Sequence, residues 1–261
     1  MLEINKIYAG NNINLIKQLD DKVIDLTITS PPYDSLRVYN GFTWDFENLA
    51  KELYRVTKDG GVVVWVISDS TRENNESLNS LKQILFFQSL GFKIETMIYQ
   101  KTPRVWNKSS LQYPNSFEYM FIAFKNRPKT FNPIIDKLNV SLGKSRKTSK
   151  RFKNGNLQKS KHHITTNPFS IRGNVWYYAT GNIHSTKDKI AFKHPAIFPE
   201  QLAADHIISW SNPGDLILDP FMGSGTVAKM AKLNNRNYIG FEISQEYCDI
   251  AQERINSVVL S

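Results

Sequence analysis

Residues 216–226 read LILDPFMGSGT, and this stretch decides the fold class. An apolar run ends at Asp219, a turn containing Gly223 and Gly225 follows, and a helical pattern begins at Thr226. A strand, a Gly-rich turn and a helix in this order form the cofactor-binding unit of open α/β sheets. The glycines let the backbone approach a ligand, and the N-terminus of the helix attracts an anionic group. The stretch therefore predicts a nucleotide-type cofactor site in residues 219–226, named here the glycine loop.

Two carboxylates indicate the kind of cofactor. Asp219 ends the predicted strand and can receive an ammonium group. Glu242 ends the next predicted strand, 23 positions later, where a carboxylate commonly accepts ribose hydroxyls. A phosphate-binding loop is the competing interpretation, but the Lys-Ser/Thr pair of that motif is absent after Gly225. An adenosyl ligand that carries an amino acid fits these residues better.

The rest of the chain alternates apolar runs with amphipathic stretches, which predicts an α/β fold with a mostly parallel sheet covered on both faces. The predicted strands are residues 2–8, 23–29, 62–68, 92–98, 117–124, 216–219 and 238–242. The predicted helices are residues 12–19, 46–56, 76–90, 199–210, 226–233 and 245–258.

A second motif, TSPPY at residues 29–33, follows the predicted strand 23–29 directly. Ligands of open α/β sheets bind at the carboxyl ends of strands, so this proline turn suits an active site. Pro31 and Pro32 lack N–H groups and stiffen the turn, which leaves its carbonyl groups accessible. The Ser30 hydroxyl and the Pro31 carbonyl can then accept hydrogen bonds from an amino group, while the Tyr33 ring can stack on a planar base. A rigid structural turn with an ordinary surface tyrosine is the alternative.

Composition limits the partners and the chemistry. The chain of 261 residues carries a formal charge of +9, which favours a polyanion such as nucleic acid. Cys248 is the single cysteine, so an internal disulfide and a cysteine-based zinc site are excluded. His162 and His163 have no acidic partners at ligand spacing, and we expect no metal. The absence of a long apolar stretch and of a secretory signal predicts a cytoplasmic protein that has no contact with a membrane.

Between Lys125 and Lys161 the chain holds twelve Lys or Arg residues and one acid, Asp136. This segment is rich in Asn, Ser, Thr and Gly and shows little apolar periodicity, so it can be a solvated, partly disordered insertion. The same run can also become ordered on phosphates. Its densest part, residues 144–161, is named here the basic run.

The proline turn and the glycine loop together resemble the amino-methylating DNA methyltransferases, which transfer a methyl group from S-adenosylmethionine. The turn precedes the loop here, which resembles the circularly permuted β group of that family. The resemblance implies a Rossmann-like, doubly wound, mostly parallel sheet of seven strands with a basic target-recognition insertion. It divides the chain into a catalytic half at residues 1–128, a target-recognition region at 129–190 and a cofactor-binding half at 191–261.

Other segments extend the resemblance along most of the chain. Residues 7–11 resemble the segment that touches the adenine of the cofactor, with Asn11 where the family usually has Asp. Residues 173–176 and 194–199 resemble the lead-in to the methionine pocket. Together with the glycine loop and Glu242, the expected cofactor contacts are Asn11, Thr29, His194, Pro195, Phe198, Asp219, Pro220, Phe221, Gly223, Ser224, Gly225, Thr226 and Glu242.

The expected catalytic residues are Ser30, Pro31, Pro32 and Tyr33, acting on a base flipped out of duplex DNA. Ser at the first position of the turn resembles the N4-cytosine enzymes, whereas Asp or Asn there resembles the N6-adenine enzymes. We expect cytosine N4 as the target, with adenine N6 as the alternative. Methylation at carbon 5 of cytosine requires a cysteine nucleophile, and Cys248 lies in a predicted helix far from both motifs.

The expected contacts with DNA lie mostly in the basic run, which would hold phosphates without specifying sequence. These residues are Lys144, Arg146, Lys147, Lys150, Arg151, Lys153 and Arg172. Two other functions remain open: amino methylation of RNA or of a protein amide on the same fold, and a DNA-binding module without catalysis. The family resemblance also implies a possible homodimer and a possible cognate restriction endonuclease as partners.

Overall fold

The computed structural model describes residues 2–32, 45–73, 75–102, 113, 115–140, 145–165, 167–181 and 184–258. Tyr33 and Lys144 lie outside these residues. The chain forms two compact units, one of residues 1–132 with 174–261 and the other of residues 133–173. In the described parts of the chain, no helix combines the length and the apolar character needed to cross a membrane.

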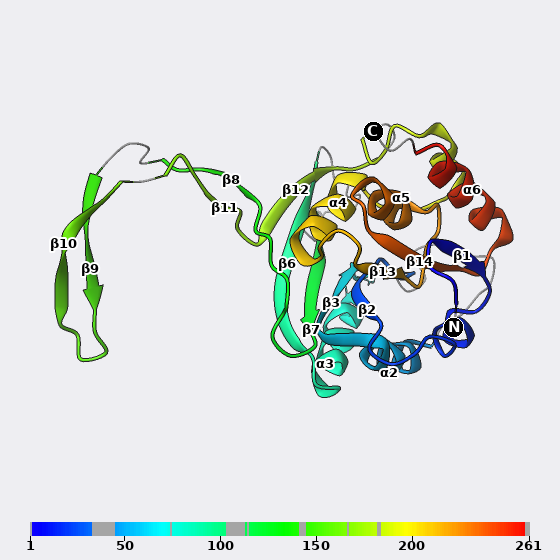
Figure 1. The fold of residues 1–261 in the computed structure, drawn as a ribbon, viewed down its shortest axis with the longest axis horizontal. Helices are drawn as coiled ribbons and strands as arrows, with labels where there is room; N and C mark the ends of the chain where they lie inside the picture. Colours follow the sequence, from blue (N-terminus) through cyan, green and yellow to red (C-terminus); the bar gives the residue numbers. More distant parts are fainter. Residues whose placement is uncertain are drawn as a thin grey trace. The chain divides into compact units, whose positions relative to one another are not determined.

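The larger unit is built on one sheet of eight strands in the order β1-β14-β13-β2-β3-β7-β6-β12 (Figure 1). Within this sheet only β7 runs against the other strands, so the expected mostly parallel α/β fold is confirmed. The strands are β1 (Lys6–Ala9), β2 (Ile24–Thr29), β3 (Thr57–Ile67), β6 (Lys93–Thr102), β7 (Phe117–Phe124), β12 (Val175–Ala179), β13 (Leu216–Asp219) and β14 (Asn237–Glu242).

The eighth strand corrects the expected number of seven. Strand β12 pairs in parallel with β6, and within it Trp176 and Tyr178 are buried while Val175 and Tyr177 are exposed. This alternation is that of a strand with one covered face. The strand was not predicted because it follows the basic region and lies inside the expected target-recognition segment 129–190.

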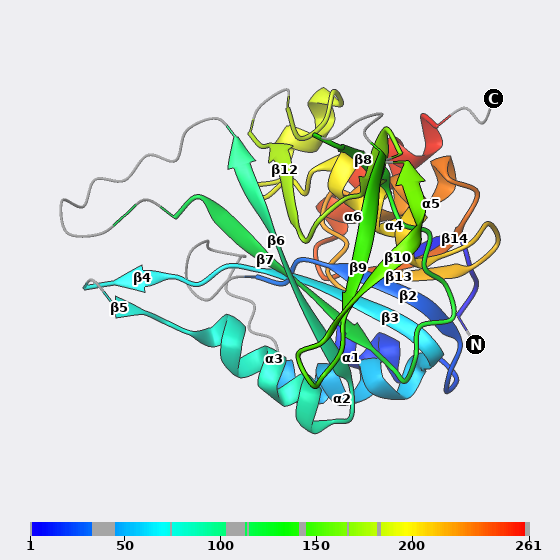
Figure 2. The same cartoon turned by 90° about the vertical axis from the view of Figure 1, so that its left-hand side faces the viewer.

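Helices cover both faces of the sheet (Figures 1 and 2). One face carries α1 (Asn12–Ile16), α2 (Phe46–Val56) and α3 (Asn79–Ser89); the other carries α4 (Glu200–Trp210), α5 (Thr226–Leu233) and α6 (Gln245–Asn256). Predicted helix 76–90 begins later than expected because residues 71–72 and 75–76 form a short antiparallel pair, β4 (Thr71–Arg72) and β5 (Asn75–Glu76).

Helix α2 illustrates how the sequence sets this arrangement. Asp45 caps the helix by accepting a hydrogen bond from the Asn48 N–H at 3.1 Å. Leu49, Leu53 and Val56 follow at helical spacing and are fully buried against the sheet. Strand β3 supplies the opposing surface, and its residues 62–67 are almost completely buried, as expected for a central strand covered on both faces.

Strands β2 and β13 form the switch point of the sheet. The chain leaves β2 through α2 and returns as β3 on one side, whereas it leaves β13 through α5 and returns as β14 on the other side. The two connections therefore diverge and leave a crevice outside the carboxyl ends of β2 and β13, where ligands of such sheets bind. The proline turn follows β2 and the glycine loop follows β13, so both motifs border this crevice.

The smaller unit contains two antiparallel strand pairs. Strand β8 (Ile135–Leu138) pairs with β11 (Phe169–Ile171), and β9 (Ser145–Arg151) pairs with β10 (Leu157–Thr165). The described part of the basic run is therefore a strand pair instead of an irregular insertion. Its turn residues 152–156 are exposed, which agrees with the expected solvated character.

Candidate active site

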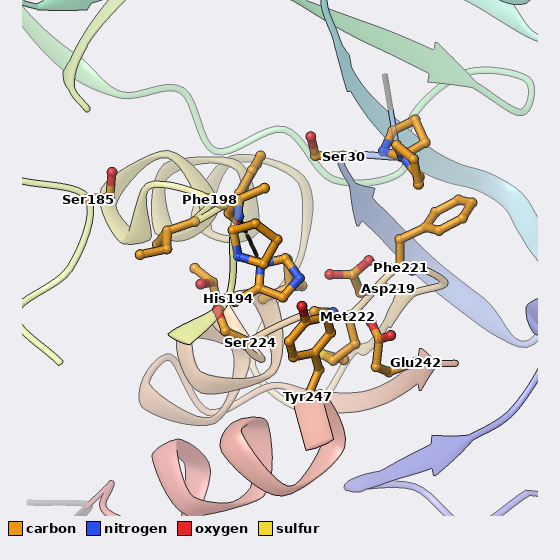
Figure 3. Close-up of a pocket in the computed structure, with 18 of the residues that line it drawn as sticks. Ser30, Ser185, His194, Phe198, Asp219, Phe221, Met222, Ser224, Glu242 and Tyr247 are labelled. Atoms are coloured by element: carbon orange, nitrogen blue, oxygen red, sulfur yellow. Dashed lines mark hydrogen bonds between the residues drawn. The ribbon is translucent and has the colours of Figure 1, made fainter. Parts of the chain in front are cut away.

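A cavity of about 800 Å³ lies at the carboxyl ends of the parallel strands (Figure 3). Ser30, Pro31 and Pro32 of the proline turn line it, as do residues 219–224 and Thr226 of the glycine loop. The structure thus brings together two turns that are about 190 positions apart in sequence. The volume is that of a pocket for a ligand of cofactor size.

Asp219 is the most deeply buried acid of the cavity, with 4% of its surface exposed. One of its carboxylate oxygens, Oδ1, accepts a hydrogen bond of 2.7 Å from the Thr29 hydroxyl and one of 3.0 Å from the Phe221 N–H. Burial raises the pKa of Asp219 to about 7, although both hydrogen bonds act in the opposite direction. A carboxylate held in this environment would gain strongly from a cationic ligand.

Glu242 ends β14 beside the glycine loop. Its Oε2 accepts a hydrogen bond of 2.8 Å from the Gly223 N–H, and its Oε1 accepts one of 2.9 Å from the Ser244 N–H. Burial raises the pKa of this carboxyl group too. Each carboxylate oxygen has a second lone pair, so Glu242 is held rigidly and can still accept hydrogen bonds from a ligand.

The glycines of the loop serve two different purposes. Gly223 has a φ of +50°, and a Cβ placed on it would lie 3.0 Å from Nε2 of His194, which lines the same cavity. Gly225 has a φ of +80°, and its Cβ would lie 2.6 Å from the Cβ of Ala251 in α6. Gly225 is not among the residues that line the cavity; the structure requires a glycine there for packing against the helix.

Residues 194–199 form another wall of the cavity. They include His194, Pro195 and Phe198, which the sequence predicts as cofactor contacts. Nδ1 of His194 lies 2.7 Å from the Ala196 carbonyl oxygen and 3.1 Å from the Ala196 nitrogen, so the ring is held by the backbone of the same wall. The His194 ring meets the Tyr247 ring edge to face, with 4.4 Å between their centroids. These contacts fix the imidazole against the glycine loop (Figure 3).

Asn11 lies two residues after the end of β1, where it lines the cavity and caps α1. Its side-chain oxygen accepts hydrogen bonds from the N–H groups of Ile13 and Asn14, at 2.9 and 3.3 Å. Asn and Asp cap helices equally well. The Asn in place of the family's usual Asp therefore preserves the helix, and its NH₂ group is the part that can approach a ligand.

A polar cluster beside the proline turn was not predicted from the sequence. The Tyr99 hydroxyl donates to Oε2 of Glu118 at 2.8 Å, and Nζ of Lys101 lies 2.6 Å from Oε1 of the same carboxylate. All three residues line the cavity. The sequence feature that could have identified this cluster is the position of its polar residues near strand ends, which face the crevice. Gly10, Ala196, Ile197, Pro199 and Met222 also line the cavity, in segments that the sequence assigned to the cofactor site. The lining residues outside those segments that were not predicted are Asn12, Ser68, Thr180, Gly181, Ser185, Phe192, Val227, Phe241, Ile243 and Tyr247.

Cys248 lies on α6 and is buried. It does not line the cavity, and burial raises the pKa of its thiol to about 11. A thiol with this pKa is almost entirely protonated near neutral pH, and the thiolate is the nucleophilic form. Cys248 is therefore a packing residue.

The expected DNA contacts fall in the smaller unit. Arg146, Lys147 and Lys150 lie on β9, and the side chains of Arg151 and Lys153 are exposed at its end. Arg172 has an acidic partner, because its Nε donates to both oxygens of Asp136, at 3.0 and 3.1 Å. The charge of Arg172 is thus shared with an acid of its own unit.

The larger unit has the features of a site for S-adenosylmethionine. The buried Asp219 suits an ammonium group, Glu242 suits a ribose diol, and the N-terminus of α5 suits a carboxylate. An α/β sheet with these groups at its switch point defines the class of S-adenosylmethionine-dependent methyltransferases. The described residues hold no group of three or more His, Cys, Asp or Glu side chains that could bind a metal.

Comparison with known proteins places the chain within this class. The model of the N6/N4 DNA methylase family matches residues 24–253, and the chain belongs to that family. An orphan methyltransferase of Bacillus amyloliquefaciens, M.BamHII, is 51% identical over 247 residues, which cover 94% of this chain and 93% of that protein. The protein is therefore a DNA methyltransferase that uses S-adenosylmethionine.

Two solved structures share the fold. The PvuII cytosine-N4-specific DNA methyltransferase aligns with a TM-score of 0.71 at 19% identity, over 97% of this chain and 87% of that chain. M1.HpyAVI in complex with S-adenosylmethionine aligns with a TM-score of 0.62 at 22% identity, over 96% of this chain and 98% of that chain.

Proposed function

We propose that this enzyme methylates the exocyclic N4 amino group of cytosine at specific sites in duplex DNA. The observation that carries the proposal is that Ser30 and Pro31 line the same cavity as Asp219 and Glu242. Acceptors for an amino group thus lie beside the groups suited to the cofactor. The serine that begins the proline turn and the fold shared with the cytosine-N4-specific PvuII enzyme both favour cytosine.

Three groups of the chain would hold the cofactor. Asp219 pairs with its ammonium group, Glu242 accepts its ribose hydroxyls, and the first turn of α5 receives its carboxylate. When bound, S-adenosylmethionine supplies a methyl group attached to a positively charged sulfur. Residues 194–199 line this cavity and would shield part of the bound cofactor from water.

The proline turn would activate the amino group. The lone pair of this nitrogen is delocalised into the ring of the base, so the nitrogen is a weak nucleophile until its hydrogens are drawn out of plane. Oγ of Ser30 and the carbonyl oxygen of Pro31 accept those hydrogens and become stronger partners as positive charge develops on nitrogen. Two prolines in succession hold these acceptors in place before the base arrives.

The target base would reach the cavity by flipping out of the duplex and stacking on Tyr33. Flipping costs a few kcal/mol. Contacts between the basic run and phosphates would offset part of this cost, because Lys and Arg side chains bind the DNA backbone regardless of sequence. The polar cluster of Tyr99, Lys101 and Glu118 lies in the same cavity, where it can contact the ring of the flipped base.

The relatives suggest the biological setting. Several are type II methyltransferases, including M.BglII of Bacillus subtilis, which is 28% identical to this chain over 262 residues. M.BamHII is described as an orphan methyltransferase. We propose that this enzyme carries out DNA methylation of the kind found in restriction-modification systems. We also propose that it acts without an obligatory endonuclease partner.

N6-adenine methylation is the second candidate, because the family includes enzymes for both amino groups. Mass spectrometry of nucleosides from DNA methylated by the purified enzyme separates the two. The proposal expects N4-methylcytosine, and N6-methyladenine as the sole product would overturn the choice of base. A competition between duplex DNA and RNA for methyl transfer in the same assay tests the substrate class, and we expect transfer to DNA.

A further inference from the structure

A network of four charged residues, one of them fully buried and three half-buried, lies behind the glycine loop. Arg254 of α6 has 1% of its side chain exposed, and its Nε and Nη2 donate to Asp188 at 3.0 Å and to Glu200 at 2.8 Å. Nζ of Lys229 on α5 contacts the same two carboxylates, each at 2.7 Å. Its two positive and two negative charges cancel, so the network has no net charge. Its effect is to hold these side chains in fixed orientations.

The network connects two walls of the cavity. Asp188 precedes the 3₁₀ turn η1 (Lys189–Lys193), and Glu200 begins α4. The wall at residues 194–199 lies between these two anchor points. Arg254 and Lys229 thereby fasten both ends of this wall to the helices that follow the glycine loop and β14.

Arg254 also contacts the glycine loop directly. Its Nη1 lies 2.6 Å from the Ser224 carbonyl oxygen, 3.0 Å from Ser224 Oγ and 3.2 Å from Thr226 Oγ1. Ser224 and Thr226 both line the cavity. Arg254 itself is buried and does not line the cavity, so the guanidinium contacts the loop from within the protein.

The direction of these hydrogen bonds has a consequence for the ligand. A guanidinium donates hydrogen bonds and cannot accept any. Each hydroxyl that accepts from Arg254 must therefore direct its own hydrogen elsewhere. The residue before Thr226 is Gly225, which provides no side-chain cap, so the first N–H groups of α5 are also available for an anion.

We propose that Arg254 is a positioning residue which makes the hydroxyls of Ser224 and Thr226 donors for the cofactor carboxylate. The inference rests on the cofactor placement proposed above. It assigns the selectivity for a carboxylate-bearing ligand to a residue about 30 positions beyond the loop, on another helix.

The test is isothermal titration calorimetry on the DNA-free enzyme, with S-adenosylmethionine and its decarboxylated analogue as ligands. We expect wild type to prefer the carboxylate form by at least about 10-fold, the value of one charge-assisted hydrogen bond. Arg254→Met should reduce this preference to within about 3-fold, and Arg254→Lys should restore only part of it. Arg236→Met is the matched control, because Arg236 donates to Ser211 and Asn234 and does not line the cavity.

Two further variants keep the test decisive if Arg254→Met fails to fold. Ser224→Ala/Thr226→Val leaves all four charges in place and should lose the same preference. Asp219→Asn should weaken both ligands and keep the preference, because it removes a different contact. An unchanged preference in the double hydroxyl variant, or equal binding of the two ligands by wild type, overturns the inference. A wild type that binds neither ligand overturns the cofactor placement itself.

Discussion

The Thr29 hydroxyl donates a hydrogen bond of 2.7 Å to the Asp219 carboxylate, across 190 positions of sequence. This contact joins the last residue of β2 to the last residue of β13, the two strands at the switch point of the sheet. It therefore links the proline turn to the glycine loop. It also opposes the rise in the pKa of Asp219 that burial causes.

Replacing Thr29 with Val should weaken cofactor binding in a pH-dependent way. Loss of the hydrogen bond raises the pKa of Asp219 further, so less of the carboxylate is ionised near neutral pH. A rise of one unit above the present value of about 7 reduces affinity at pH 7 about 5-fold, and the reduction fades above pH 8. Calorimetric titrations from pH 6 to 9 measure the ratio of wild-type to variant affinity for the cofactor.

Thr27→Val is the matched control for that experiment. Thr27 lies on the same strand and is fully buried, and its hydroxyl has no hydrogen-bond partner among the described residues. Removing this hydroxyl should leave cofactor affinity unchanged at every pH. Equal pH profiles for the Thr29 and Thr27 variants would show that the contact with Asp219 does not tune binding.

Asp219→Asn should change how stability depends on pH in the cofactor-free protein. The folded pKa of about 7 lies above the unfolded value, so the folded state holds its proton more tightly. Stability from this group is complete below about pH 4 and is lost as pH rises through 7, by up to a few kcal/mol. Urea unfolding between pH 5 and 8 should give a flatter profile for the variant. Parallel profiles of stability against pH for wild type and variant would contradict the raised pKa of Asp219.

Ser30→Ala should slow methyl transfer without weakening the cofactor. Removing one oriented acceptor from a site where charge develops should lower kcat about 10- to 100-fold. Single-turnover rates and calorimetry measure the two effects separately. Ser209→Ala, a buried serine on α4 that does not line the cavity, controls for general loss of a hydroxyl. A full rate in the Ser30 variant would remove Ser30 from the mechanism.

Much of this site could be predicted from the sequence because strand ends are readable locally. The apolar runs before Asp219 and Thr29 and the turn residues after them are all short-range signals. Parallel strands present their carboxyl ends at the same edge, so the cavity follows once the sheet is assumed. The strand at residues 175–179 was not predicted because it follows the basic region, where residues 173–176 are interpreted as a segment leading to the methionine pocket.

The charged network and the polar cluster could not be predicted because their partners are distant in sequence. Arg254 contacts Asp188 and Glu200, which Lys229 contacts too, and nothing in the pattern of α6 distinguishes this arginine from a solvated one. Glu118 similarly finds its partners on the neighbouring strand β6. The two roles of Gly223 and Gly225 also depend on tertiary contacts, with His194 in one case and with α6 in the other.

Cys248→Ala should retain methyl transfer within about 2-fold, since the thiol is buried and its pKa is raised to about 11. The product nucleoside should also be unchanged. Radiolabelled methyl transfer measures the rate, and nucleoside mass spectrometry identifies the product. A loss of activity in a variant that still folds and binds the cofactor would revive carbon methylation through a cysteine.

Neutralising the basic run should flatten the salt dependence of DNA binding. Replacing Arg146, Lys147, Lys150, Arg151 and Lys153 with Gln should reduce the slope of log K against log salt by about 0.9 for each phosphate that the protein no longer neutralises. Fluorescence anisotropy from 50 to 200 mM salt, the range over which this dependence is steep, measures the slope. Lys51→Gln, an exposed lysine of the larger unit, should leave it unchanged. An unaltered slope in the five-residue variant would exclude the phosphate role.

A crystal structure of the enzyme with sinefungin, an analogue that carries an amine at the position of the transferred methyl group, is the most direct measurement. We predict that its α-ammonium lies against Asp219, its ribose hydroxyls against Glu242, and its amine toward Ser30 and Pro31. An analogue bound outside this cavity, or one whose amine faces away from the proline turn, would contradict the placement of cofactor and target base in one site.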